Sequence, residues 1–110
     1  MMNNFSHLRL TGQIKIETTK IIYLQSVWNY TYVHTQEKQH LSSHTLKSLS
    51  SKINLDSFIK IHRGLLINTS YIHEINRERK DPFVVLKNGK VLPISRRKYN
   101  EVVDSLVRIN

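Results

Sequence analysis

The sequence predicts a mainly β domain with one short helix near its middle and a second helix at its C-terminal end. Apolar and polar residues alternate over several short runs, which is typical of half-buried strands. An Asn88-Gly89 pair separates two apolar runs, as in a β-hairpin. Apolar residues at helical spacing occur in residues 45–53 and again after Ser95.

The N-terminal half contains most of the short strand signals. Residues 8–16 keep a period of two, which predicts two strands or a hairpin, and residues 21–24 form a compact apolar run suited to a buried strand. Residues 27–30 are an aromatic-rich loop or strand edge, residues 31–35 favour a strand, and residues 37–39 favour a turn. Residues 1–7 are polar, so we expect a flexible tail followed by one domain over residues 8–110.

The middle helix is expected from Thr45 to Ile53. Leu46, Leu49 and Ile53 form one apolar stripe, and the side chain of Thr45 or Ser43 can cap the first turn. The segment is short and rich in serine, so packing must hold it in a helical conformation.

The C-terminal half begins with expected strands at residues 58–64, 65–68 and 71–75, followed by a basic surface loop at residues 77–82. Asn88-Gly89 then suits a type I′ turn, because both residues tolerate positive φ. Ser95 is the expected N-cap of the last helix. The apolar face of that helix comprises Tyr99, Val102, Val103, Leu106 and Ile109.

Composition narrows the possible functions. A chain of 110 residues without cysteine fits a single domain and excludes a disulfide-stapled scaffold, a zinc ribbon and a thiol nucleophile. No apolar run approaches the roughly 18 residues that a membrane span needs, and residues 1–7 lack the features of a signal peptide. We therefore expect a cytoplasmic protein without membrane contact.

The strongest compositional signal is positive charge. The chain has 17 Lys and Arg against 8 Asp and Glu, which gives a net charge of +9. Residues 60–110 carry most of this excess. Such a balance suits a polyanionic partner, because cations that contact phosphates release condensed counterions. Charge alone is equally compatible with an ordinary basic protein.

Metal binding and catalysis find little support. His34, His40 and His44 lie close in sequence, but ordinary surface histidines explain them better than a metal site, so we expect no metal and no cofactor. The chain lacks a nucleophile motif, a glycine-rich phosphate loop and an evident pair of catalytic carboxyl groups. We therefore do not expect an enzyme.

Three polar or basic stretches remain as candidate contacts. Residues 28–31 offer an amide suited to adenine and hydroxyls suited to phosphate, although composition alone favours a plain aromatic-capped hairpin. Residues 60–64 place Arg63 at a turn, while His62 is as easily a structural hydrogen-bonding residue as a ligand contact. Residues 95–98 cluster three cations at the start of a helix, where an incoming phosphate would relieve an unfavourable dipole interaction.

Together these stretches resemble the LytTR domain in order and spacing, from about Leu10 to Leu106. The resemblance rests on the segments IIYL at residues 21–24 with Asn29-Tyr30, TLKSL at residues 45–49, FIKIHRGLLIN at residues 58–68 and LKNGKVLPISRR at residues 86–97. It implies an elongated arrangement of small antiparallel sheets. It also implies an output domain of a bacterial transcription (response) regulator of two-component type, whose loops enter successive major grooves of double-stranded DNA.

Carried onto this chain, the family's DNA contacts fall on three groups of residues. The resemblance assigns Asn29, Tyr30 and Thr31 to the first, His62 and Arg63 to the second, and Arg96, Arg97 and Lys98 to the third. It does not settle whether Arg96 or Arg97 reaches a base. Lys60 is added as a contact that positions the DNA backbone.

The resemblance also bears on partners. Relatives occupy paired repeat sites, so a second copy of the chain on an adjacent site is expected. Relatives also carry this domain behind a receiver domain or membrane helices, and neither is present in this sequence. Two alternatives stay open from the residues alone, namely an RNA-binding module and a basic module that docks an acidic protein.

Overall fold

The computed structural model describes residues 7–12, 14–53, 56–78 and 80–109, and strands dominate them. In chain order the elements are β1 (His7–Thr11), β2 (Ile14–Glu17), the 3-10 helix η1 (Thr18–Lys20), β3 (Ile21–Val27), β4 (Tyr30–Thr35), β5 (Gln39–Ser42), α1 (Leu46–Ser50), β6 (Phe58–His62), β7 (Leu65–Asn68), η2 (Thr69–Tyr71), β8 (Ile72–Asn76), β9 (Phe83–Leu86), β10 (Val91–Pro93), η3 (Arg96–Lys98) and α2 (Tyr99–Ile109). The predicted fold class is confirmed. The predicted tail lies outside the described residues except for His7, which begins β1.

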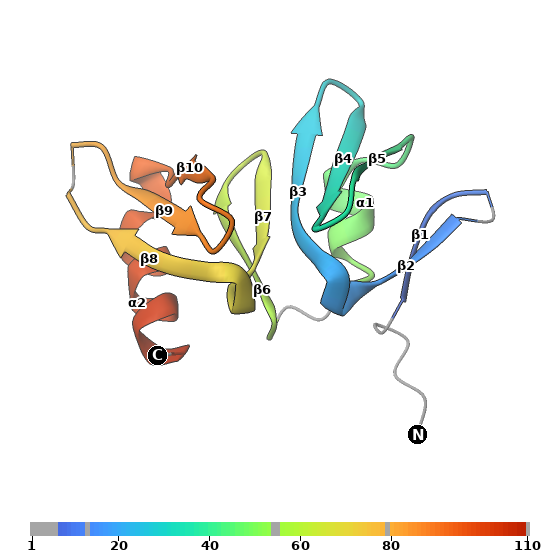
Figure 1. Cartoon of the computed structure of the whole chain (residues 1–110). Helices are drawn as coiled ribbons and strands as arrows, with labels where there is room; N and C mark the ends of the chain where they lie inside the picture. Colours follow the sequence, from blue (N-terminus) through green and yellow to red (C-terminus); the bar gives the residue numbers. More distant parts are fainter. Residues whose placement is uncertain (1–6, 13, 54–55, 79, 110) are drawn as a thin grey trace.

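The strands form three antiparallel sheets. A five-stranded sheet in the order β5-β4-β3-β7-β6 lies between a two-stranded sheet, β1-β2, and a three-stranded sheet, β10-β9-β8. Figure 1 shows the three sheets side by side, with α1 near β1 and β2 and with α2 packed beside β6. β3 is central, and its residues 21–24 are all buried, as expected for a strand covered on both faces.

Two hydrophobic cores cover the two faces of the central sheet. The first contains residues from β1, β2, β3, α1 and β7, among them Leu8, Leu24, Leu49 and Leu66. The second joins the central sheet to the three-stranded sheet and α2, and it includes Ile61, Ile67, Val84 and Val102. The two layers cover the faces of the central sheet. The loops at the ends of its strands therefore remain accessible at the surface.

The middle helix is shorter than predicted, while its cap is as predicted. α1 ends at Ser50 rather than at Ile53, although Ile53 remains buried. The hydroxyl of Thr45 accepts a hydrogen bond of 3.1 Å from the backbone N–H of Ser48. This bond satisfies one of the N–H groups that the first turn leaves without a helical partner.

Three local features differ from the sequence predictions. β5 was not predicted, because its burial pattern is inverted: Leu41 is 53% exposed, whereas Ser42 is buried and donates to the carbonyl of Leu10.

The β9–β10 turn is not type I′. Lys90 O accepts from Leu86 N and closes a three-residue loop in which only Gly89 has positive φ, as in a turn with a G1 bulge.

The last helix also starts differently from the prediction. Ser95 precedes the 3-10 helix η3 rather than α2 directly, and its side chain makes no capping hydrogen bond. Val102 and Leu106 are buried as predicted, and Tyr99 and Val103 are partly buried. The side chain of Ile109 lies outside the described residues.

His34 is a structural residue rather than the surface histidine that the sequence suggested. Its ring stacks on Tyr23 with centroids 4.0 Å apart and planes 12° apart. Its Nε2 is buried without a hydrogen-bond partner. Burial and the charge of Lys90 lower the pKa of His34 from its usual value of 6.5, and burial raises the pKa of the Tyr23 hydroxyl.

We predict that His34 makes folding sensitive to acid. In the unfolded chain His34 takes up a proton near pH 6.5, whereas in the folded chain it does so only at lower pH. The free energy of unfolding should therefore fall as the pH drops from about 7.5 to about 5. The variant His34→Phe, which keeps a stacked ring, should lose less stability over this range in urea titrations. A control with the exposed His73→Gln should behave as the wild type, and equal pH dependence in wild type and His34→Phe would contradict the prediction.

Candidate functional site

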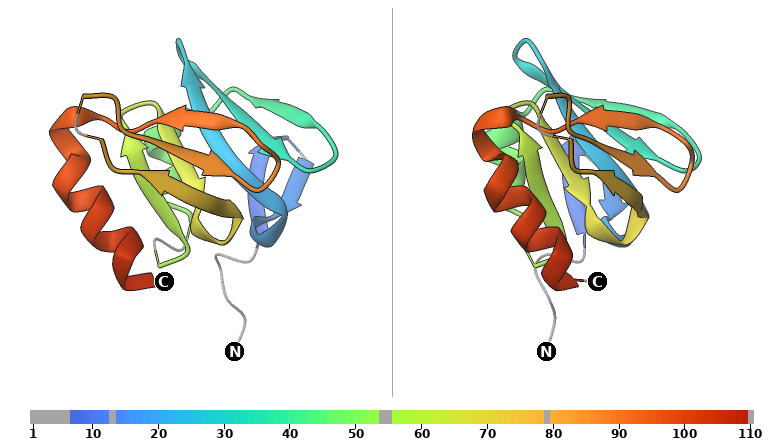
Figure 2. Two further views of the ribbon diagram at one scale, coloured as in Figure 1. Left: turned by 60° about the vertical axis from the view of Figure 1, so that its left-hand side comes forward. Right: turned by 90° about the vertical axis from the view of Figure 1, so that its left-hand side faces the viewer.

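Three connections lie at the same end of the central sheet. They are the β3–β4 turn, the β6–β7 turn and the segment between β10 and α2, and both Figure 1 and Figure 2 place them along the upper edge of the molecule. We call this the loop edge and define it by residues 28–31, 62–64 and 95–98. It brings together all but one of the residues to which the sequence assigned contacts, the exception being Lys60.

Backbone hydrogen bonds hold the three loops together. The N–H of Ser26, one residue before the end of β3, donates to the carbonyl of Gly64 over 2.9 Å. The N–H of Ser95 donates to the carbonyl of Ile61 in β6 over 2.7 Å. The β6–β7 turn is thus fixed beside the β3–β4 hairpin on one side, and β6 is fixed to the segment before η3 on the other.

The first loop is a tight hairpin turn. Val27 pairs with Tyr30 and leaves Trp28 and Asn29 at the tip. Trp28 has φ of 58°, and it is the only non-glycine residue with positive φ in the described part of the chain. Positive φ at the first turn position is typical of type II′, where glycine is preferred, so a bulky residue there carries strain of order 1–3 kcal/mol. Asn29 and Tyr30 are exposed.

Thr31 requires a correction. Its side chain is 0% exposed, and its hydroxyl donates to the carbonyl of His44 over 2.8 Å. The side chain therefore has no surface to offer a ligand, and its role is to tie the start of β4 to the segment after β5. The sequence did hold the signal: Thr31 shares its position in the period-two pattern with the buried Val33, so both side chains point to the same face.

The second loop presents Arg63. Its side chain is exposed at the β6–β7 turn. His62 is half-buried, and its Nδ1 accepts a bond of 3.3 Å from the N–H of Gly64, so the structural reading of His62 is correct for that atom. Lys60 lies lower on β6, where it lines a groove with Lys98 of η3 and Glu101 of α2.

The third loop separates the two arginines that the sequence left equivalent. The guanidinium of Arg96 donates to the carbonyl of Lys80 over 2.6 Å. Arg97 is exposed, and no partner for its guanidinium is found among the described residues. Arg96 therefore braces the β8–β9 loop, whereas Arg97 is available to a ligand.

The β8–β9 loop extends the loop edge. Besides the bond from Arg96, the hydroxyl of Tyr99 donates to the carbonyl of Arg77. These bonds hold the backbone of Arg77 and Lys80 beside η3 and the start of α2, and the side chains of both residues are exposed. The sequence predicts only a basic surface loop at residues 77–82, because the bonds that place this loop beside η3 are tertiary.

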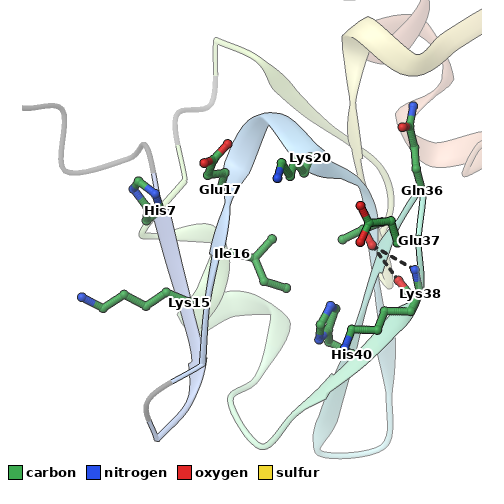
Figure 3. Close-up of a pocket in the computed structure, with 10 residues that line it drawn as sticks. His7, Lys15, Ile16, Glu17, Lys20, Gln36, Glu37, Lys38 and His40 are labelled. Carbon is green, nitrogen blue, oxygen red and sulfur yellow. Dashed lines mark hydrogen bonds between the residues drawn. The ribbon is translucent and has the colours of Figure 1, made fainter.

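A pocket of about 410 Å³ lies at the opposite end of the central sheet. Figure 3 shows it between β2 and the β4–β5 turn, with Lys20 and His40 on its walls. Its lining residues are His7, Lys15, Ile16, Glu17, Lys20, Thr35, Gln36, Glu37, Lys38 and His40. The lining mixes both charge signs, in contrast to the predominantly basic loop edge.

The three histidines that are close in sequence do not converge. Val33 pairs with His40 and His34 with Gln39, so His34 and His40 point to opposite faces of the sheet. Within the described residues no cluster of three or more His, Cys, Asp or Glu side chains has the geometry to hold a metal ion. In the same part of the chain, no helix combines the length and the apolar character that crossing a bilayer needs.

Comparison with known sequences assigns the family. The sequence profile of the LytTr DNA-binding domain matches residues 11–106. The chain belongs to the LytTR family. The structure of the LytTr DNA-binding domain of a response regulator from Bacillus cereus has the same fold, with a TM-score of 0.79 and 24% identity over 93% of this chain and 96% of that one.

Two known proteins contain segments that are similar to this chain. The chain is 30% identical over 88 residues to the sensory transduction protein LytT of Bacillus subtilis, a match that covers 79% of this chain and 36% of LytT. It is 23% identical over 83 residues to the CO-responsive transcriptional regulator RcoM of Rhodospirillum rubrum, covering 74% of this chain and 35% of RcoM. The chain thus spans little more than a third of these relatives.

Proposed function

We propose that this LytTR chain binds specific sequences in double-stranded DNA through the loop edge and thereby regulates transcription. The observation that carries the proposal is the alignment of three loops at one end of the central sheet, each of which carries an amide or at least one arginine. The net charge of +9 supports it, since phosphate contacts supply much of the affinity for DNA. The family membership supports it independently.

Two exposed arginines are the proposed base readers. Arg63 and Arg97 stand on different loops, and a guanidinium fork matches the two acceptors of guanine in the major groove. Asn29 offers an amide that suits adenine, and the exposed Tyr30 beside it offers a hydroxyl to phosphate. Thr31 is not included, because it is buried.

The remaining cations position the duplex. Lys60 and Lys98 face one groove and would contact the same stretch of backbone, with His62 nearby at the end of β6. Arg96 acts mainly through its bond to Lys80 O, which keeps the β8–β9 loop in place. Contacts of this kind fix register without reading sequence.

We also propose that the loops of the loop edge enter successive major grooves of one duplex. The molecule is elongated, with a longest extent of 42 Å. We further propose that two copies occupy paired repeat sites on one DNA, and that a sensor or receiver domain on another part of a longer protein supplies the signal. A regulator of this kind acts where the chromosome is, in the cytoplasm.

The alternative of RNA binding depends on an aromatic platform of Trp28, Tyr30 and Tyr32. Tyr32 is half-buried, and its ring is tilted against His34 with centroids 6.4 Å apart. Tyr32 is therefore not freely available to stack on an unpaired base, and the three aromatic rings do not form a continuous platform for RNA. An acidic protein partner would contact the same cations as DNA, so the structure does not separate these two functions. Binding experiments are needed to distinguish DNA binding from both RNA binding and docking of an acidic protein.

Selection from a random duplex library tests the proposal. The chain should enrich one sequence motif and bind it with a Kd of roughly 10⁻⁸ M or tighter at about 0.15 M salt. Single-stranded RNA of equal length should compete poorly with the selected duplex. Failure to enrich any motif, or equal competition by RNA, would reject sequence-specific binding to duplex DNA.

The two neighbouring arginines should differ in their effect on specificity. Arg97→Ala, like Arg63→Ala, should weaken binding to the selected site by about 1–3 kcal/mol and relax the preference at one base pair. Arg96→Ala should leave the base preference unchanged, because the guanidinium of Arg96 is bonded to Lys80 O. Fluorescence anisotropy on a panel of single-base variants of the site measures both quantities. A relaxed preference in Arg96→Ala with an unchanged one in Arg97→Ala would reverse the assignment.

A further inference from the structure

Trp28 is the residue that the proposed function leaves unexplained. It is 92% exposed, whereas the other exposed large hydrophobic residues are between 50% and 53% exposed. It stands at the tip of the β3–β4 hairpin with φ of 58°, a conformation in which glycine would be favoured. Both the backbone and the hydrophobic effect thus disfavour tryptophan at this position in the free protein.

The indole has no structural role in the described part of the chain. It is not among the stacked or tilted aromatic pairs there, which involve Tyr23, Tyr32 and His34. The hairpin itself is closed by the Val27–Tyr30 pair and does not depend on the turn side chain. A large apolar group that is held in the open by a strained turn indicates contact with a ligand.

The position of Trp28 points to duplex DNA as that ligand. The bond from Ser26 N to Gly64 O holds the β3–β4 hairpin beside the turn that carries Arg63. A duplex that meets Arg63 in its major groove therefore also meets the hairpin tip. The apolar feature of the major groove is the 5-methyl group of thymine, and the amide of the adjacent Asn29 suits adenine.

We propose that Trp28 packs its indole against a thymine methyl group, so that the hairpin tip reads an A·T base pair. The inference rests on the proposed DNA binding and adds a specific apolar contact to it. The positive φ of Trp28 is then the conformation that projects the indole beyond the end of the sheet. The strain is retained in the free chain because the indole contributes affinity in the complex.

Two substitutions separate the roles of the side chain and the backbone. Trp28→Ala removes the indole and keeps the strained φ, whereas Trp28→Gly removes both. Each should weaken binding to the selected duplex about fivefold or more. Trp28→Gly should in addition raise the melting temperature above that of Trp28→Ala, because glycine adopts positive φ without strain. Val91→Ala, which truncates a residue that is 53% exposed on β10, is the control and should bind as the wild type.

Replacement of single thymines by deoxyuridine tests the methyl contact. Loss of one methyl group should weaken binding of the wild-type chain about fourfold at one or two positions of the site. Trp28→Ala should show no further loss at those positions. If the wild type tolerates every replacement, the methyl contact is wrong, and an indole inserted between base pairs would give that result. If Trp28→Ala remains as sensitive as the wild type, the methyl contact is also wrong, because a residue other than Trp28 must then contact the methyl group.

The outcomes also separate this inference from the proposed function. If the wild-type chain enriches a duplex motif but Trp28→Ala binds it equally well, only the role of Trp28 is rejected. If the wild-type chain enriches no motif, the proposed function and this inference are rejected together.

Discussion

Two backbone hydrogen bonds, Ser26 N to Gly64 O and Ser95 N to Ile61 O, determine how the candidate functional site of this molecule is built. The first follows from the antiparallel pairing of β3 with β7, which brings the β6–β7 turn to the end of the β3–β4 hairpin. The second attaches the segment before η3 to β6. Residues 29, 63 and 97 are far apart in sequence, and strand pairing together with these two bonds brings their loops to one edge.

The two hydrophobic cores anchor the strands that carry this edge. The central sheet is covered on one face by β1, β2 and α1, and on the other by the three-stranded sheet and α2. Its strands are therefore fixed in register by burial, because a slip of one residue would turn their apolar side chains to the wrong face. The loops are exposed, but their ends are attached to well-buried strands.

The sequence predicted the elements whose signals are local. The apolar run of residues 21–24, the stripe and cap of α1 and the glycine turn before β10 all depend on neighbours in sequence. β5 was missed because its outward Leu41 and inward Ser42 reverse the usual pattern, and Ser42 is buried through a bond to Leu10 O, 32 residues away. The turn type between β9 and β10 was wrong because the bond from Leu86 N to Lys90 O encloses three residues, and the Asn-Gly pair alone does not reveal the length of the loop.

The candidate site was predictable to the same extent. Residue type and order placed cations and amides in three loops, and the exposed Asn29, Arg63 and Arg97 lie there. The burial of Thr31 could have been expected because Thr31 lies two residues before the apolar Val33 and therefore points to the same face of β4. The difference between Arg96 and Arg97 could not, because it depends on the carbonyl of Lys80 in a loop that is distant in sequence. The strain at Trp28 is likewise a property of the folded turn.

The central claim is that one duplex contacts all three loops at the same time. Backbone amide chemical shifts of the chain, recorded by nuclear magnetic resonance with and without the selected duplex, test it directly. The account predicts shift changes concentrated in residues 28–31, 62–64 and 95–98, with little change around the pocket between β2 and the β4–β5 turn. Changes concentrated at that pocket, or confined to one of the three loops, would contradict it.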